Sequence, residues 1–244
     1  MKSSHPIVRN LVLALGLAAA GWFIGHGFVR ARMANRFVSV KGISEREVRA
    51  GLAIWPLKII IADNDLGRAH GKLATDIREI QGFLTRHGLD ATHTELQDFA
   101  VTDALANPGQ SAEKVANRYV IQQTLIVRSD QPEKIREASQ QIGELLRAGL
   151  VLSSGGEYGM GGPAYIFTGL NDLKPQMIAE ATARARSAAE QFARDSRSVI
   201  GGIRQANQGL FEILPRDEAP GIREESQIQK KVRVVSTIEY FLQD

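Results

Sequence analysis

The sequence predicts an α+β protein of mainly antiparallel sheet with three packed helices. It is built from two strand–helix–strand units and preceded by one N-terminal transmembrane helix. Three observations predict this architecture. Residues 118–128 and 228–242 alternate apolar and polar side chains, as half-buried strands do. Residues 66–84 place leucine and isoleucine at helical spacing. Residues 11–29 are apolar and uncharged over nearly the roughly 20 residues that cross a bilayer as a helix.

The N-terminal segment consists of a basic tail, residues 1–10, and the apolar run of residues 11–29. A cleaved signal peptide is one interpretation, with Lys2 and Arg9 as its basic region and cleavage near residues 18–20. The apolar run continues through Phe28, beyond the usual roughly 7–15 residues, so an uncleaved anchor fits better. Basic residues flank both ends and do not decide the orientation. We expect a single-pass inner-membrane protein with its C-terminal domain in the periplasm, the alternative being secretion to the periplasm after cleavage.

Charge and composition argue against several functional classes. The net charge is +3, but residues 1–36 hold five basic residues and no acid, so the rest of the chain is net acidic. Aromatic residues make up 6% of the chain and do not alternate with a basic cluster, so we expect no nucleic-acid partner. The absence of cysteine excludes disulfides, thiolate metal sites and a cysteine nucleophile.

The first strand–helix–strand unit is predicted between residues 47 and 101. A short strand at residues 36–41 precedes it and ends at Gly42. The apolar alternation of residues 48–61 changes phase around Trp55 and Pro56, which predicts one long strand with a bulge or bend there.

The helix of this first unit is predicted over residues 66–84, with Gly88 as its stop. The acidic residues of the segment 63–65 precede it. They do not fit the spacing of a calcium-binding loop, so we interpret them as helix caps. Residues 92–101 follow as a strand with weak alternation.

The second unit is predicted between residues 118 and 168. Its first strand, residues 118–128, has an apolar face that Gln123 interrupts. Asp130 and Glu133 then suggest a capping box at the start of a helix that ends at Gly149. The glycine-rich segment 155–162 has neither phosphate-loop nor dinucleotide-binding spacing, so a flexible connection to the strand at residues 165–168 is expected.

A long alanine-rich helix and two strands complete the predicted fold. Asn171 or Asp172 is the expected helix cap, with Pro175 in the first turn. Residues 203–214 and 228–242 are predicted strands, and the last is long enough to pair with a partner at a sheet edge. The side chains expected on the buried face of the helix are Met177, Ala181, Ala185, Ala188 and Phe192.

Residues 36–244 resemble the bacterial SIMPL domain family of envelope proteins. The most specific matching element is YIFTGLNDLKPQMIAEATARARSAAEQFARDS, an apolar strand followed by the alanine-rich helix. Further matches are RFVSVKG, GLAIWPLKI, NRYVIQQTLIV, GGIRQANQGLFEI and KKVRVVSTIEYFL. The resemblance implies an antiparallel α+β domain in a largely uncharacterised family, whose members self-associate into rings or larger homo-oligomers and are linked to envelope stress. It implies no enzyme activity and no cofactor.

We therefore expect a membrane-anchored, self-associating scaffold or interaction module, and not an enzyme. No catalytic, cofactor-binding or metal-binding residue is assigned. Within the anchor, Gly16 with Ala20 and Gly21 with Gly25 would let two helices pack closely, although such residues are common in membrane helices.

Two alternative functions rest on particular side chains. An enzyme would need its acids and histidines to converge in a cleft. A periplasmic module that binds a small molecule or peptide would use aromatic side chains, although aromatics are more often buried anchors. The candidates for the enzyme are Asp63, Asp65, Asp98, Asp172, His70, His87 and His93, and those for the binding module are Trp55, Tyr158 and Tyr165.

Overall fold

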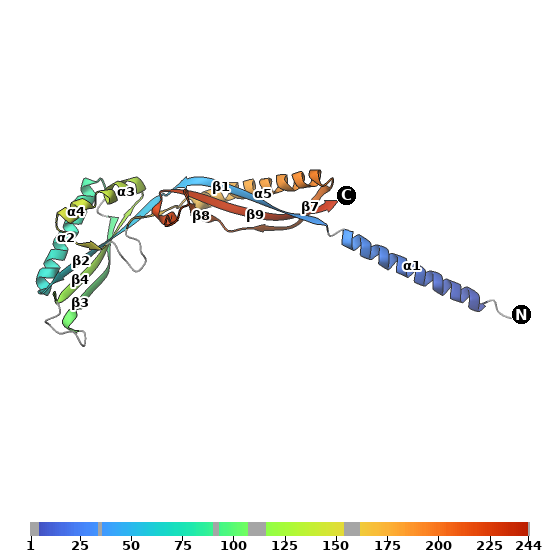
Figure 1. Cartoon of the computed structure of the whole chain (residues 1–244), viewed down its shortest axis with the longest axis horizontal. Coiled ribbons are helices and arrows are strands. Elements are labelled where there is room, and N and C mark those ends of the chain that lie inside the picture. Colours follow the sequence, from blue (N-terminus) through green and yellow to red (C-terminus); the bar gives the residue numbers. More distant parts are fainter. Residues whose placement is uncertain (1–4, 34–35, 90–92, 107–115, 154–161, 244) are drawn as a thin grey trace. The chain divides into compact units, whose positions relative to one another are not determined.

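A computed structural model describes residues 5–33, 36–89, 93–106, 116–153 and 162–243 (Figure 1). The α+β class with antiparallel sheets is confirmed. The strands form two sheets, and the described residues contain four helices after the N-terminal one, where three were predicted. The helices are α1 (His5–Met33), α2 (Leu66–Arg86), α3 (Pro132–Gln140), α4 (Gly143–Arg147) and α5 (Leu170–Asp195). The strands are β1 (Phe37–Arg49), β2 (Leu52–Asp63), β3 (Thr94–Asp103), β4 (Tyr119–Ser129), β5 (Leu152–Ser153), β6 (Ala164–Ile166), β7 (Val199–Gln208), β8 (Glu212–Pro215) and β9 (Gln229–Gln243).

The chain forms two compact units. Unit 1 comprises Met1–Glu45, Lys174–Phe211 and Arg233–Asp244, and unit 2 comprises Arg46–Leu173 and Glu212–Val232. Strands β1 and β9 contribute residues to both units.

Helix α1 contains one segment, Asn10–Phe28, that is long and apolar enough to be a membrane span or a signal sequence. Its apolar side chains are exposed, with Leu17 at 71% and Phe23 at 75%. A helix that is apolar all round needs an apolar surrounding, which the described part of this chain does not provide.

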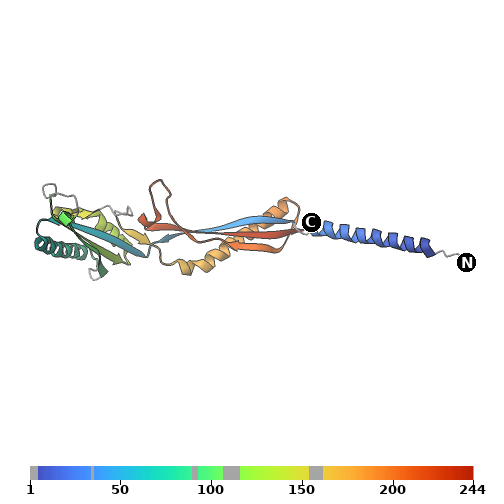
Figure 2. The ribbon, with the colours of Figure 1, turned by 90° about the horizontal axis from the view of Figure 1, so that it is seen from below.

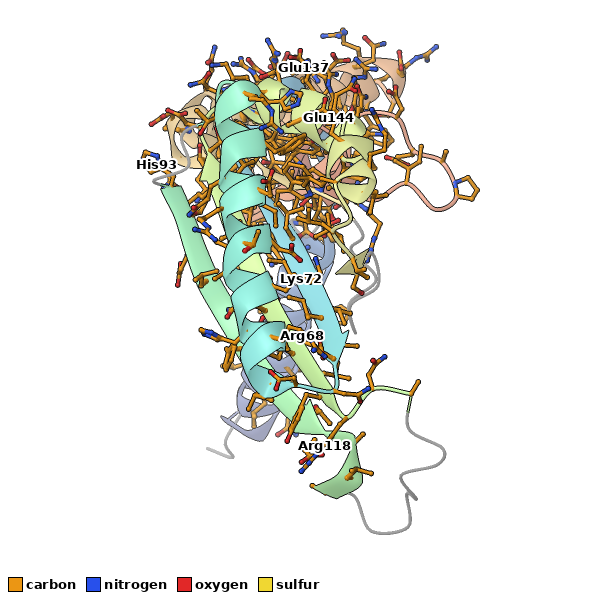
Figure 3. The ribbon with its side chains drawn as sticks, turned by 90° about the vertical axis from the view of Figure 1, so that its left-hand side faces the viewer. Arg68, Lys72, His93, Arg118, Glu137 and Glu144 are labelled. Carbon is orange, nitrogen blue, oxygen red and sulfur yellow. The ribbon has the colours of Figure 1, made fainter. Side chains whose placement is uncertain are left out.

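Unit 2 is built on a five-stranded sheet of order β3-β4-β2-β5, with β6 also paired to β2. Helix α2 packs on β2 and β4, and β3 lies at the edge of the sheet beside it (Figure 3). The two predicted strand–helix–strand units thus share one sheet. Its core includes Trp55, Ile59, Ile80, Phe83, Ile121, Leu125 and Ile135.

The predicted bend at Trp55 and Pro56 is wrong. Strand β2 keeps one phase through both residues, and the chain breaks at Gly51, between β1 and β2. Pro56 faces the edge at which Ile60 N donates to Val151 O (3.2 Å). Pro56 lies between the residues of β2 that pair with β6 and those that pair with β5. No neighbouring strand needs a backbone N–H at this position, so proline is tolerated there.

The ends of α2 agree with the sequence. The side chain of Asp65 accepts a hydrogen bond from Arg68 N (2.7 Å) and caps the helix. Gly88 follows the helix with φ of 70°, a conformation that glycine adopts without strain.

The helix predicted between Asp130 and Gly149 is divided into α3 and α4. Gln131, and not Asp130, precedes the first turn of α3, and no side chain caps it. Gln123 faces the core as expected, and its Nε2 donates to Gln97 O (2.7 Å). That carbonyl belongs to a bulge in β3, where the register with β4 shifts between Gln97 and Ala100, so the buried amide is satisfied.

Unit 1 places α5 against a sheet of order β1-β9-β7. Strand β8, whose residues belong to unit 2, also pairs with β9. Strand β9 is therefore central, not the edge strand that its length suggested. The predicted strand at residues 203–214 is two strands, β7 and β8. Helix α5 begins at Leu170, so Pro175 lies beyond the first turn and neither predicted cap precedes the helix.

The buried stripe of α5 agrees with the predicted face at Met177, Ala181 and Ala185 and differs from it in the last turns of the helix. Ala188 and Phe192 are exposed. The buried residues are spaced four apart, so their side chains form one ridge that is inclined to the helix axis. This ridge of small side chains stays in contact with the sheet along the whole helix. The buried residues are Met177, Ala181, Ala185, Ala189 and Ala193.

Gly42 does not end a strand. It lies within β1, directly against α5, where a Cβ atom would lie 1.8 Å from Ala181 O and 2.5 Å from Ala185 N. The next two residues of β1 also bind α5, since Arg184 Nη1 donates to Ile43 O (2.6 Å) and Ser44 Oγ to Glu180 Oε2 (2.8 Å). The glycine is needed for backbone-to-backbone contact.

Candidate functional site

The acidic residues at the start of α2 have structural roles. Asp63 binds the guanidinium of Arg68 and accepts a hydrogen bond from Asp65 N (2.9 Å). These two contacts hold the pKa of the Asp63 carboxyl far below its ordinary range. Asp65 caps the helix, as predicted.

A second ion pair fixes the far ends of β3 and β4. Asp103 is forked by Arg118, which keeps the pKa of the Asp103 carboxyl lowered. Arg118 N donates to Asn64 Oδ1 (2.9 Å), which ties this pair to the start of α2. Asp63 and Asp103 are thus each paired with an arginine.

The candidate histidines do not converge with the acids. His70 and His87 are on and just beyond α2, about 25 Å apart at the helical rise. His70 is exposed, whereas His87 packs on Phe83 and lies 3.5 Å from Glu144 Oε1. His93 borders two open pockets beside Arg128, of about 380 and 440 Å³.

The other two acids are also apart. Asp98 is in the β3 bulge with φ of 54°, and Asp172 is in the first turn of α5. Across the described residues, no three histidine, aspartate or glutamate side chains are grouped so that they could hold a metal ion.

The aromatic candidates are core residues where the structure describes them. Trp55 is buried with its ring edge-on to Phe83, and Tyr165 is 5% exposed. Burial raises the pKa of the Tyr165 phenol. Tyr165 also borders a pocket of about 310 Å³ with Arg136 and Arg216. Tyr158 and most of the glycine-rich segment 155–162 lie outside the described residues.

One buried charge was not anticipated. Lys230 is fully buried in β9, where Nζ donates to the carbonyl oxygen and to the carboxylate of Glu224. Lysine is buried only when it is paired, and this pair holds the short 3-10 helix Glu224–Ser226 against the strand.

The outer strand β3 exposes large apolar side chains. Leu96 pairs with Leu125 and Val101 with Ile121, and both partners are 1% exposed. The apolar layer under α2 therefore continues to β3 but is uncovered there, with Leu96 at 50% and Val101 at 44% exposure. Phe99, beside the bulge, is 57% exposed. We call Leu96, Phe99 and Val101 the β3 patch.

Sequence reasoning missed the β3 patch. The weak alternation of residues 92–101 was its only signal, because a strand with neither face covered has no reason to alternate.

Comparison with known proteins gives one match. A family model described as SIMPL, protein of unknown function (DUF541), matches residues 38–238, which include parts of both units. Comparison with curated proteins finds no match.

Proposed function

The chain belongs to the SIMPL family, and from this premise we propose that it is a membrane-anchored envelope protein acting as a homo-oligomeric scaffold. Its α1 helix is the anchor, its C-terminal domain lies in the periplasm, and it has no catalytic role of its own. The acids and histidines most suited to chemistry serve as caps and ion pairs or lie apart, which supports a structural role.

The β3 patch is the observation that carries self-association. It exposes three large apolar side chains on one edge strand, next to a core that is otherwise covered by α2. Leu96 and Val101 lie on one face of β3, with Phe99 between them in sequence, and exposed apolar side chains grouped on one element mark interaction sites. A second copy can cover it without any polar complementarity, because the patch is formed by apolar side chains alone.

Side chains, more than strand pairing, make this contact. The bulge between Gln97 and Ala100 interrupts the outer edge of β3, and Asp98 takes a left-handed conformation there. Such bulges oppose edge-to-edge pairing of strands. Phe99 lies in this bulge, between the paired residues Gln97 and Ala100, and its side chain is exposed.

The anchor favours this association. Copies tethered by α1 share one membrane, so their local concentration is far above that of free protein, and a modest patch then suffices. Envelope stress is the setting in which we propose that the assembly acts.

The mass of the full-length protein in mild detergent tests the proposal. We expect the wild type to elute as a multiple of its 26.7 kDa chain in size exclusion with light scattering. Phe99→Ser combined with Leu96→Ser should shift the population toward the monomer. Val151→Ser, at an equally exposed site outside the patch, is the control and should leave the mass unchanged. A wild type that is strictly monomeric refutes self-association, and an assembly indifferent to the β3 changes refutes the patch.

A further inference from the structure

One end of unit 1 adjoins the anchor. Leu242 N donates to Arg36 O (2.9 Å), and Val199 pairs with Gln243. The last turn of α5 and the start of β7 lie at this same end, near the C-terminal end of β9 (Figure 2). We call this the sheet end.

The chain length keeps the sheet end near the membrane. The five residues of α1 that follow Phe28, residues 29–33, extend the helix by about 7.5 Å, roughly the thickness of the headgroup layer. Phe37 is then within about 14 Å of the end of α1, even for a fully extended chain. The sheet end can therefore reach the bilayer surface, and its chemistry decides whether it stays there.

One face of the sheet end is apolar. Phe37 and Phe241 are on adjacent strands and face away from α5, because their neighbours Val38 and Tyr240 face it. Val199, opposite Gln243, shares that outer face and is 58% exposed. Arg204 holds the Phe37 ring from above, with its guanidinium carbon 3.9 Å from the ring centre.

Arginines and a further aromatic ring lie on the other side. Phe192, in the last turn of α5, is 47% exposed. Arg194 and Arg197 follow it and are exposed, with Asp195 between them as the one acidic residue of this turn. Phenylalanine and aliphatic side chains beside arginines are typical of protein surfaces that lie on a membrane, where the apolar side chains enter the boundary of headgroups and acyl chains and the guanidinium groups meet phosphates.

We propose that the sheet end docks on the membrane surface. Phe192 and Val199 enter the headgroup layer, and Arg194 and Arg197 contact lipid phosphates. The docking proposal rests on the proposed membrane anchor. It adds a second contact, because the sheet end itself binds the bilayer surface in addition to the tether that α1 provides. Anionic lipids strengthen the contact, since the two arginines outnumber Asp195.

Single-cysteine labelling tests this directly, because the chain has no cysteine of its own. The full-length protein is reconstituted in phosphatidylcholine vesicles, with and without phosphatidylglycerol. Bimane is attached at Phe192→Cys or Val199→Cys, and its quenching by lipids brominated near the headgroup is measured. Ala179→Cys is the matched control, exposed on the same helix about 20 Å from Phe192. Leu17→Cys reports on the anchor itself.

Docking predicts severalfold stronger quenching at positions 192 and 199 than at 179. In vesicles with phosphatidylglycerol, Arg194→Gln with Arg197→Asn should lower the docked-to-undocked ratio about fivefold per arginine. Arg186→Gln, two turns earlier on α5, should change nothing. Quenching at 17 but not at 192 and 199 overturns docking and leaves the anchor standing. No quenching at 17 overturns both.

Discussion

Replacing Gly42 by alanine tests the packing of α5 on β1. The new Cβ would lie 1.8 Å from Ala181 O, whereas ordinary contact begins near 3.4 Å, so strand and helix must separate by about 1.6 Å. A gap of that size removes a large share of the dispersion energy along the alanine stripe. Overpacking lowers the free energy of unfolding by about 3 kcal/mol. Alanine offsets up to about 1 kcal/mol of this, because it loses less backbone entropy than glycine on folding. We expect a net loss of about 2 kcal/mol.

Thermal unfolding of the full-length protein in detergent, followed by circular dichroism, measures this loss. A net loss of about 2 kcal/mol lowers the Tm by about 4–8 °C for a chain of this size. Gly202→Ala is the control in β7, since nothing lies within 4 Å of its Cβ position. Ala181→Gly should not rescue Gly42→Ala, because the clash is with backbone atoms. If the Gly42→Ala protein is as stable as Gly202→Ala, then β1 and α5 are not in backbone contact at Gly42.

Three further predictions concern the helices and buried charges. Because the folded pKa of Asp63 is depressed, its stabilisation is present above the ordinary value of 3.8 and is lost as the pH falls below it. The acid-induced fall in Tm below about pH 4 should therefore be smaller in Asp63→Asn. Glu224→Ala should cost about 3 kcal/mol in urea unfolding because it removes the carboxylate from the buried Lys230 ammonium and leaves only the residue 224 carbonyl, whereas Lys230→Met should change little. Ala189→Leu should destabilise the folded protein by about 1–3 kcal/mol because residue 189 is buried against the sheet, whereas Ala188→Leu should be neutral. If calorimetry gives the two variants the same stability, the buried face of α5 is assigned wrongly.

The sequence was most informative where local signals and tertiary packing agree. Asp65 marks the start of α2 and Gly88 its end, and both act through hydrogen bonds or dihedral angles within a few residues. The alternation of β9 was predicted correctly, with Val232, Val234, Ile238 and Tyr240 buried. That the protein is not an enzyme stays a prediction from the sequence.

The errors arose where a contact distant in sequence gives a residue its role. Gly42 resembled a strand breaker, but its small size serves contact with α5, some 140 residues later. Pro56 resembled a bend, but it faces a gap between two short neighbouring strands. The face of α5 was predicted correctly as far as Ala185 and wrongly at Ala188 and Phe192, because small residues lie on several sides of the helix and only the sheet decides which are buried. The β3 patch likewise required the sheet order.

The assembled mass of the full-length protein in a lipid bilayer is the decisive measurement of self-association. Native mass measurement of the protein in nanodiscs counts the chains in each particle without removing the anchor. We expect particles holding several 26.7 kDa chains, and we expect the number to fall toward one chain when Leu96 and Phe99 are replaced by serine. Single chains for the wild type across a range of protein-to-lipid ratios would contradict self-association.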